Sequence, residues 1–201
     1  MGIFDRLFGG KKTTPPEKKE TTVNDNKENF NDSRLKIHFN ELEDKGITTH
    51  YNGKPFTGLC YNLYENGNLL VECEMINGLK NGFYRDYYEN GIMKSDISYK
   101  EDKKNGKYRE YLDNGNLFTE ETYLNDMSNG RYLVYNEENG KIEQEKYFIN
   151  DIQNGSYKQW NDDGILVCEG FYENGVRTGI WKNWDNKGNL KEEDFTNNTE
   201  I

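Results

Sequence analysis

The sequence predicts an all-β protein: an elongated antiparallel meander of about six 24-residue β-hairpin repeats that form a single twisted sheet. Three observations lead to this fold class. Glycines recur at a fixed spacing, Asn-Gly pairs occur eleven times, and alanine is absent from all 201 residues. Asn and Gly tolerate positive φ, so an Asn-Gly pair between alternating apolar residues is a strong hairpin signal. A chain without alanine and rich in Gly and Asn disfavours helices.

Two glycines mark each repeat. The opening glycines follow one another at 24 or 25 residues: Gly58, Gly82, Gly106, Gly130, Gly155 and Gly179. A second glycine comes nine residues after each, or ten in the fourth unit. A fixed period of about 20–50 residues indicates stacked supersecondary units.

Five other columns repeat with the glycines. The first aromatic column is Cys60, Tyr84, Tyr108, Tyr132, Tyr157 and Trp181. The second aromatic column is Leu63, Tyr87, Tyr111, Tyr135, Trp160 and Trp184. The aliphatic column is Leu69, Met93, Leu117, Ile142, Leu166 and Leu190. The acid column is Glu72, Asp96, Glu120, Glu145, Glu169 and Glu193. The last aromatic column is Met75, Tyr99, Tyr123, Phe148 and Tyr172, with Thr196 in the final unit.

Each unit is therefore expected to be a strand, an Asn-Gly turn, a second strand and a short link, with the eleven Asn-Gly pairs as corners of the meander. If Asn-Gly fills a two-residue turn, period-two alternation assigns the faces. Tyr108, Leu117 and Tyr123 then share one face, and Tyr111 and Glu120 share the other. A β-bulge between columns would change this parity.

The chain before the repeats divides into two parts. In "MGIFDRLFGGKK" the apolar residues Ile3, Phe4, Leu7 and Phe8 recur at helical spacing, which predicts a short amphipathic segment. The polar, proline-containing remainder of residues 1–33 predicts a flexible linker. Residues 34–57 contain the strand-like runs "RLKIHF" and "GITTHYNGKPFTG" and are expected to lead into the six repeats of residues 58–201.

Charge argues against a nucleic-acid partner. The formal net charge is −10, and residues 58–201 hold sixteen Lys or Arg against twenty-seven Asp or Glu. An acidic body of this kind repels phosphate backbones at long range.

Cysteine and histidine give no sign of a metal or cofactor site. Cys60, Cys73 and Cys168 are widely spaced, and only two histidines are present, which fits neither a zinc site nor a disulfide framework. We expect three small apolar thiols in a reducing compartment. No apolar run approaches the roughly 18 residues of a transmembrane helix, and the N-terminus lacks the features of a secretory signal. These patterns predict a cytoplasmic protein.

The acid column does not predict an enzyme. Each carboxylate occupies the same position in its repeat, whereas a catalytic pair needs two different environments. We expect the column to be structural and the chain to have no enzymatic activity.

The third unit, "GKYREYLDNGNLFTEETYLNDMSNG", resembles the MORN-repeat variant, and the lead-in "YNGKPFTG" resembles the start of bacterial YwqK-family antitoxin components. The resemblance spans about residues 46–196. It implies an elongated sheet of hairpins and an interaction role, either as the antitoxin or immunity partner of a protein toxin or as a scaffold near membranes. The first and last units depart from the aromatic pattern, as terminal repeats usually do.

The candidate partner-binding residues are the second aromatic column and its neighbouring acids: Tyr87, Tyr111, Tyr135, Trp160, Trp184, Glu120, Glu145 and Glu169. Aromatic residues dominate interface hot spots, and carboxylates beside them suit a basic surface, such as that of a toxin. The same rings are open to a second interpretation, in which they pack on the stems of nearby Lys and Arg and only cover the sheet. The alternative function is a membrane-associated scaffold that is tethered through residues 1–12.

Overall fold

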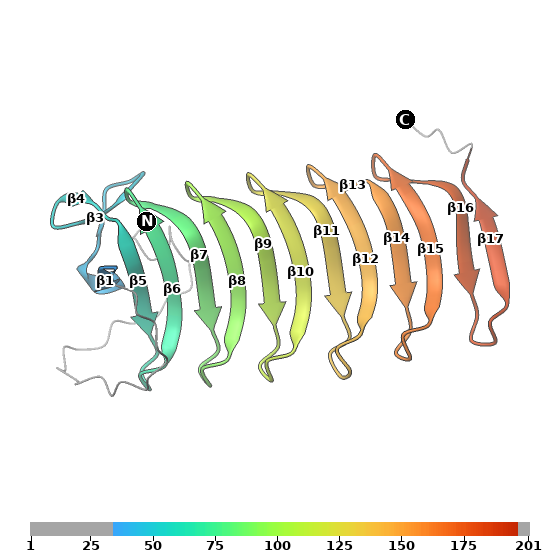
Figure 1. The fold of residues 1–201 in the computed structure, drawn as a ribbon, viewed down its shortest axis with the longest axis horizontal. Coiled ribbons are helices and arrows are strands. Elements are labelled where there is room, and N and C mark those ends of the chain that lie inside the picture. The colour runs from blue at the N-terminus through green and yellow to red at the C-terminus, as the bar shows by residue number, and fades with distance from the viewer. Residues whose placement is uncertain (1–33, 197–201) are drawn as a thin grey trace.

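The computed structural model describes residues 34–196, which form one long sheet with a small cap at its N-terminal end (Figure 1). The predicted amphipathic segment and linker, residues 1–33, lie outside the described residues. The cap consists of short elements: β1 (Lys36–His38), the 3₁₀ helix η1 (Phe39–Glu41), β2 (Glu43–Asp44), β3 (Thr49–Tyr51) and β4 (Lys54–Pro55). No helix among residues 34–196 has both the length and the apolar character needed to cross a membrane.

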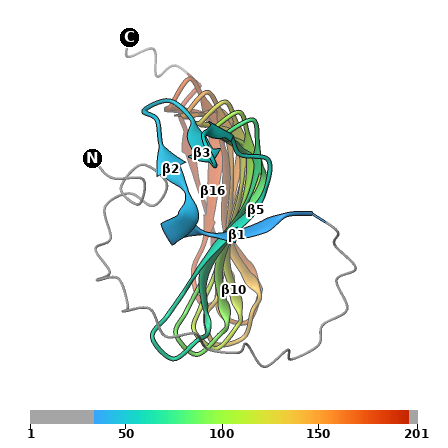
Figure 2. The ribbon, with the colours of Figure 1, turned by 90° about the vertical axis from the view of Figure 1, so that its left-hand side faces the viewer.

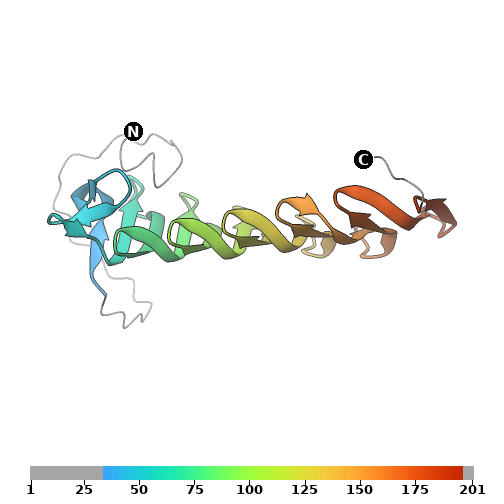
Figure 3. The same cartoon turned by 90° about the horizontal axis from the view of Figure 1, so that it is seen from above.

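The body is a succession of antiparallel hairpins, which confirms the predicted all-β meander. Its strands are β5 (Gly58–Leu63), β6 (Leu69–Ile76), β7 (Leu79–Tyr87), β8 (Met93–Lys100), β9 (Lys103–Tyr111), β10 (Leu117–Leu124), β11 (Met127–Tyr135), β12 (Ile142–Ile149), β13 (Ile152–Gln153), β14 (Gly155–Trp160), β15 (Leu166–Glu173), β16 (Val176–Trp184) and β17 (Leu190–Asp194). They follow one another in chain order within a 14-stranded sheet, except that the two-residue β13 pairs with β12 beside this path. β1 adds to β5 in parallel. Viewed from above, the sheet is a long, narrow ribbon (Figure 3).

Two-residue turns join each repeat to the next at one end of the strands. They are Asn77-Gly78, Glu101-Asp102, Asn125-Asp126, Asn150-Asp151 and Asn174-Gly175. Both residues of each turn have positive φ, as a type I′ turn requires. The Asp of three turns also accepts a hydrogen bond from a backbone N–H of the preceding repeat; the Asp126 Oδ1 to Lys104 N distance is 2.7 Å. These contacts tie neighbouring repeats together.

At the other end of the strands, loops of five or six residues close each hairpin. The third hairpin, for example, is closed by residues 112–116, in which Gly115 has a φ of 89°. The predicted two-residue Asn-Gly turns are therefore wrong at this end. Each loop is longer than two residues, and only the glycine of each Asn-Gly pair takes positive φ, whereas a type I′ turn needs both.

Four of the eleven Asn-Gly pairs lie within or at the start of strands rather than at corners. The prediction that all eleven pairs are corners is therefore wrong for these four. They are Asn81-Gly82, Asn105-Gly106, Asn129-Gly130 and Asn154-Gly155. In β9 the pair lies in a bulge, where the register against β8 shifts between Ile97 and Tyr99. Gly106 has a φ of 117°, and a Cβ there would lie 2.9 Å from the Ser98 Cβ. The glycine thus allows the strand to pass close to the residue opposite the bulge.

A second bulge decides which side chains share a face. In the third hairpin Leu117 pairs with Tyr111, and the register then shifts so that Phe118 is the extra residue. One extra residue reverses the alternation, so Leu117 lies on the face of Tyr111. The prediction that Leu117 shares a face with Tyr108 and Tyr123 is wrong for this reason. The two tyrosines do lie together, with ring centroids 6.0 Å apart.

The cap packs on one face of the first hairpin (Figure 2). The main core lies between them: Ile37, Phe39, Leu42, Phe56, Cys60, Val71, Cys73 and Met75. Beyond the cap, most side chains of the single-layer sheet are half-buried. We call the face beneath the cap, which also carries Tyr84, Tyr108 and Tyr132, the cap face. The opposite face, which carries Tyr111 and Leu117, is the stripe face.

Candidate functional site

The stripe face carries a row of apolar side chains near the hairpin loops. In every hairpin the second aromatic column pairs directly with the aliphatic column: Leu63 with Leu69, Tyr87 with Met93, Tyr111 with Leu117, Tyr135 with Ile142, Trp160 with Leu166, and Trp184 with Leu190. All five rings of this column are half-buried. Directly opposed aromatic and aliphatic side chains stabilise a sheet. Because the hairpins lie side by side, these pairs form one strip along the body, which we call the stripe.

Next to the stripe, charged side chains alternate in sign from strand to strand; we call this row the charge ladder. The register places the following residues opposite one another in turn: Glu72, Arg85, Asp96, Arg109, Glu120, Leu133, Glu145, Lys158, Glu169, Lys182 and Glu192. Within it, Arg85 lies 3.2 Å from Asp96 and Arg109 lies 2.7 Å from Glu120. Opposite charges in directly paired positions favour this register.

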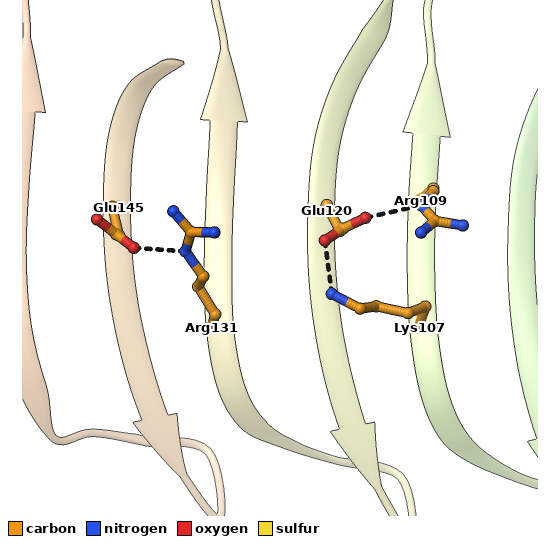
Figure 4. A network of polar contacts seen from close by, with 5 residues as sticks. All are labelled: Lys107, Arg109, Glu120, Arg131 and Glu145. Atoms are coloured by element: carbon orange, nitrogen blue, oxygen red, sulfur yellow. Dashed lines mark hydrogen bonds and ion pairs between the residues drawn. The ribbon is translucent and has the colours of Figure 1, made fainter.

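Leu133 interrupts the charge ladder between Glu120 and Glu145. Figure 4 shows these two acids with the bases that pair with them. This leucine is only 3% exposed, so it contributes an apolar contact where four other units have Lys or Arg. Two bases from outside the row supply the missing charge. Lys107 Nζ lies 2.5 Å from a Glu120 oxygen, and Arg131 pairs with Glu145. Both acids beside the interruption therefore keep a cationic partner.

The ion pairs also affect protonation on this face. Burial disfavours the ionised form of Glu120, but the hydrogen bonds and charges of Lys107 and Arg109 outweigh it and hold the pKa of Glu120 below its usual value. The Tyr87 hydroxyl donates a hydrogen bond of 2.8 Å to Glu72. Burial, together with that carboxylate, raises the pKa of Tyr87. At neutral pH the rings are thus uncharged, and the acids that flank them are paired with bases.

The cap face uses its aromatic rings differently. The first and last aromatic columns meet edge to face within four hairpins, with centroids 5.9 to 6.2 Å apart: Tyr84 with Tyr99, Tyr108 with Tyr123, Tyr132 with Phe148, and Tyr157 with Tyr172. Lys80 and Lys104 place their ammonium groups over these rings, at 4.2 Å from Tyr99 and 4.7 Å from Tyr123. Edge-to-face and cation–π contacts of this kind stabilise the hairpins. These rings therefore serve the fold directly.

All eight residues of the predicted site lie on the stripe face. The five rings belong to the stripe, whereas Glu120, Glu145 and Glu169 belong to the charge ladder. Glu145 is only 9% exposed, and Glu169 pairs with Lys182 at 3.2 Å. The carboxylates therefore have partners within the chain.

The predicted site left out the bases that complete the charge ladder, although the second interpretation of the rings places Lys and Arg side chains against them. A Lys or Arg stands two residues before the second aromatic column in four units, at Arg85, Arg109, Lys158 and Lys182. This spacing places base and ring on one face and was the available signal. Among the described residues, no group of three or more His, Cys, Asp or Glu could hold a metal ion.

The acid column also needs one correction. The last hairpin has no second bulge, and its register is regular from Ile180 to Trp184. Glu193 therefore pairs with Trp181 on the cap face, and Glu192 takes the place in the charge ladder opposite Lys182.

Comparison with known proteins agrees with the repeat architecture. The family model described as MORN repeat variant matches residues 56–77, 80–101, 104–125, 153–174 and 177–198. The fourth hairpin, whose loop has one extra residue, lies between the third and fourth matched segments. A search of curated proteins found no match to this chain. Because the family model matches more than half of the sequence, the chain belongs to the MORN repeat variant family.

Proposed function

We propose that this chain is a non-enzymatic binding protein that holds a protein partner along the stripe. Repeats of this family are generally associated with binding to proteins or membranes. The observation that carries the proposal is the stripe itself: half-buried Tyr and Trp rings at the same place in five consecutive hairpins. Aromatic residues beside a polar rim are the composition of protein interfaces.

The choice of face rests on how the two sets of rings are used. On the cap face the rings contact one another edge to face, and the first hairpin is covered by residues 34–57. On the stripe face each ring has an aliphatic residue opposite it and a charge ladder beside it. Repeat proteins commonly bind along such an extended face. A partner that covers the stripe buries the part of these five rings that is still exposed to solvent.

The charge ladder limits how a basic partner binds. Its acids already have Lys or Arg partners, so a cationic side chain of the partner has to replace one of them. Residues 58–201 nevertheless carry sixteen bases against twenty-seven acids, which attracts a basic protein at long range. We therefore propose that burial of the rings provides the binding affinity, and that the net negative charge speeds the association of a basic partner.

The specific role that we propose is that of an antitoxin or immunity protein for a basic protein toxin in the cytoplasm. Support comes from the likeness of "YNGKPFTG" to the start of YwqK-family antitoxin components. Catalysis has no part in this proposal, because the acids of the charge ladder occupy corresponding positions in successive hairpins and each lies opposite a Lys or Arg.

The experiment compares three tagged proteins in the native host. The wild type is expected to capture a defined partner, and Tyr111→Ser with Trp160→Ser is expected to lose it. Tyr123→Ser with Tyr172→Ser removes two rings from the cap face and serves as the matched control. Each variant is compared only after circular dichroism shows a folded sheet. Loss of the partner by the control, with retention by the stripe variant, would place the interface on the cap face.

A toxin partner makes a separate prediction. The captured protein, expressed alone, is expected to stop growth, and co-expression of this chain is expected to restore it. Normal growth with the captured protein alone would leave protein binding intact and reject the antitoxin role.

The second candidate is a membrane-associated scaffold. It rests on the helical spacing of Ile3, Phe4, Leu7 and Phe8 ahead of Lys11 and Lys12, all of which lie outside the described residues. Co-sedimentation with anionic vesicles that is lost on deletion of residues 1–12 would favour this function over the first.

A further inference from the structure

Two of the three cysteines lie face to face in the core beneath the cap. Cys60 on β5 pairs directly with Cys73 on β6, and both are 0% exposed. Their Sγ atoms lie 2.7 Å apart. Phe39, Leu42 and Phe56 of the cap belong to the same cluster. The first hairpin therefore has two thiols where the second has Tyr84 and Ile97.

The backbone geometry suits a covalent link between these residues. Directly opposed residues of antiparallel strands have Cα atoms about 4.5 or 5.5 Å apart, depending on the type of pair. Disulfides span Cα distances of about 4.4–6.8 Å, with a bond of about 2.05 Å. Cys60 and Cys73 can thus be joined without a change of strand register.

We propose that Cys60 and Cys73 form a dithiol site that is converted to an intramolecular disulfide by exchange with a small-molecule disulfide. One cysteine thiolate attacks a sulfur of the small disulfide, and the first small thiolate leaves and takes up a proton. The second cysteine, as its thiolate, attacks the mixed disulfide and releases the other small thiol. Two electrons pass from the cysteine pair to the oxidant, and one Sγ–Sγ bond forms between β5 and β6.

The cap controls access to this chemistry. Phe56, which is 2% exposed, packs in the same cluster as both thiols. Burial and the neighbouring thiol also raise the pKa of Cys60, which keeps the reactive thiolate scarce. Exchange is therefore expected to be slow while the cap is closed and faster when the cap loosens.

Cys168 provides the internal comparison. It is half-buried on β15 and lies opposite Gln159 and Asn183, so neither of its cross-strand neighbours is a thiol. Exchange at this position is expected to stop at a mixed disulfide.

The test uses the full chain with Cys168→Ser, incubated folded with oxidised glutathione and followed by intact mass spectrometry. The expected product is a monomer lighter by two hydrogen atoms, with no retained glutathione and no thiol open to alkylation after denaturation. Cys60→Ser in this background is expected never to lose two hydrogen atoms. Three outcomes would each overturn the proposal. They are a stable glutathione adduct, a disulfide-linked dimer, and two alkylated thiols after a model dithiol has been fully oxidised.

A second measurement tests the role of the cap. Phe56→Ala is expected to speed disulfide formation several-fold. Leu133→Ala, which creates a similar defect at a buried position of the fourth hairpin, is expected to leave the rate unchanged. Equal acceleration by both variants would mean that global unfolding, rather than opening of the cap, exposes the thiols.

Discussion

Leu117 lies directly opposite Tyr111 across the third hairpin, and this pair places an aliphatic side chain against an aromatic ring on the stripe face. The same pairing recurs from Tyr87 with Met93 to Trp184 with Leu190. The aliphatic column thus supports the rings from within their own hairpin. A single-layer sheet has no second layer to hold such rings, so the residue opposite each one fixes its position.

Truncation of Leu117 to alanine is expected to lower the stability of the fold. It is also expected to weaken partner binding along the stripe. Leu117→Ala should cost about 1–3 kcal/mol in unfolding free energy, less than a fully buried leucine, because Leu117 is half-buried. Urea unfolding of the full chain measures this cost. Leu124→Ala, at a side chain that is 46% exposed, is the control and is expected to change stability by under about 0.5 kcal/mol. Equal costs at the two positions would contradict the pairing.

The two glycines of the third hairpin are expected to differ in their tolerance of a side chain. Gly106 has a φ of 117° and close approach to Ser98, whereas Gly115 has a φ of 89° and no atom nearer than 3.8 Å to an added Cβ. Gly106→Ala should therefore destabilise by more than Gly115→Ala, with each strained backbone costing on the order of 1–3 kcal/mol. Thermal melting of the two variants gives the order, and the reverse order would reject the bulge at Gly106.

One turn is expected to improve on substitution. Glu101 has a φ of 51° in a type I′ turn, a position that asparagine occupies in the four other turns between repeats. Asparagine tolerates this conformation better than glutamate. Glu101→Asn is expected to raise stability by roughly 0.5–1 kcal/mol. An unchanged or lower melting midpoint would show that Glu101 makes a compensating contact. Glu89→Asn, in an exposed hairpin loop, controls for the loss of charge.

The fold was predictable because several columns repeat together. The 24-residue period and the Asn-Gly pairs predict hairpins, and period-two alternation places Tyr111 and Glu120 on one face, as the structure does. The spacing does not reveal a bulge, because Phe118 is an ordinary strand residue that becomes the extra one only when the loop is longer than two residues. For this reason the spacing alone places Leu117 on the wrong face.

The thiol pair could have been found from the same pattern. Centring the first hairpin on Asn66-Gly67 places Cys60 opposite Cys73, as observed. The odd number of cysteines and their wide spacing pointed away from a link. The repeat pattern does not predict that the cap buries this pair, because Phe39 and Phe56 contact it only through tertiary packing.

The stability of the charge ladder is expected to depend on pH through Glu120. Its folded-state pKa lies below the usual value, so its contribution is present above the unfolded pKa of about 4.3 and is lost as the pH falls through the folded pKa. Glu120→Gln should lower the unfolding free energy at pH 7 by up to about 1 kcal/mol, because the pair is partly exposed to solvent. The difference from wild type should shrink steadily below about pH 4.3, as the wild-type carboxyl gains its proton.

Urea unfolding at pH 7 and pH 3 measures both values, and Glu89→Gln in an exposed loop is the matched control. A difference that stays constant between the two pH values would mean that Glu120 acts through packing rather than through its ion pairs with Arg109 and Lys107.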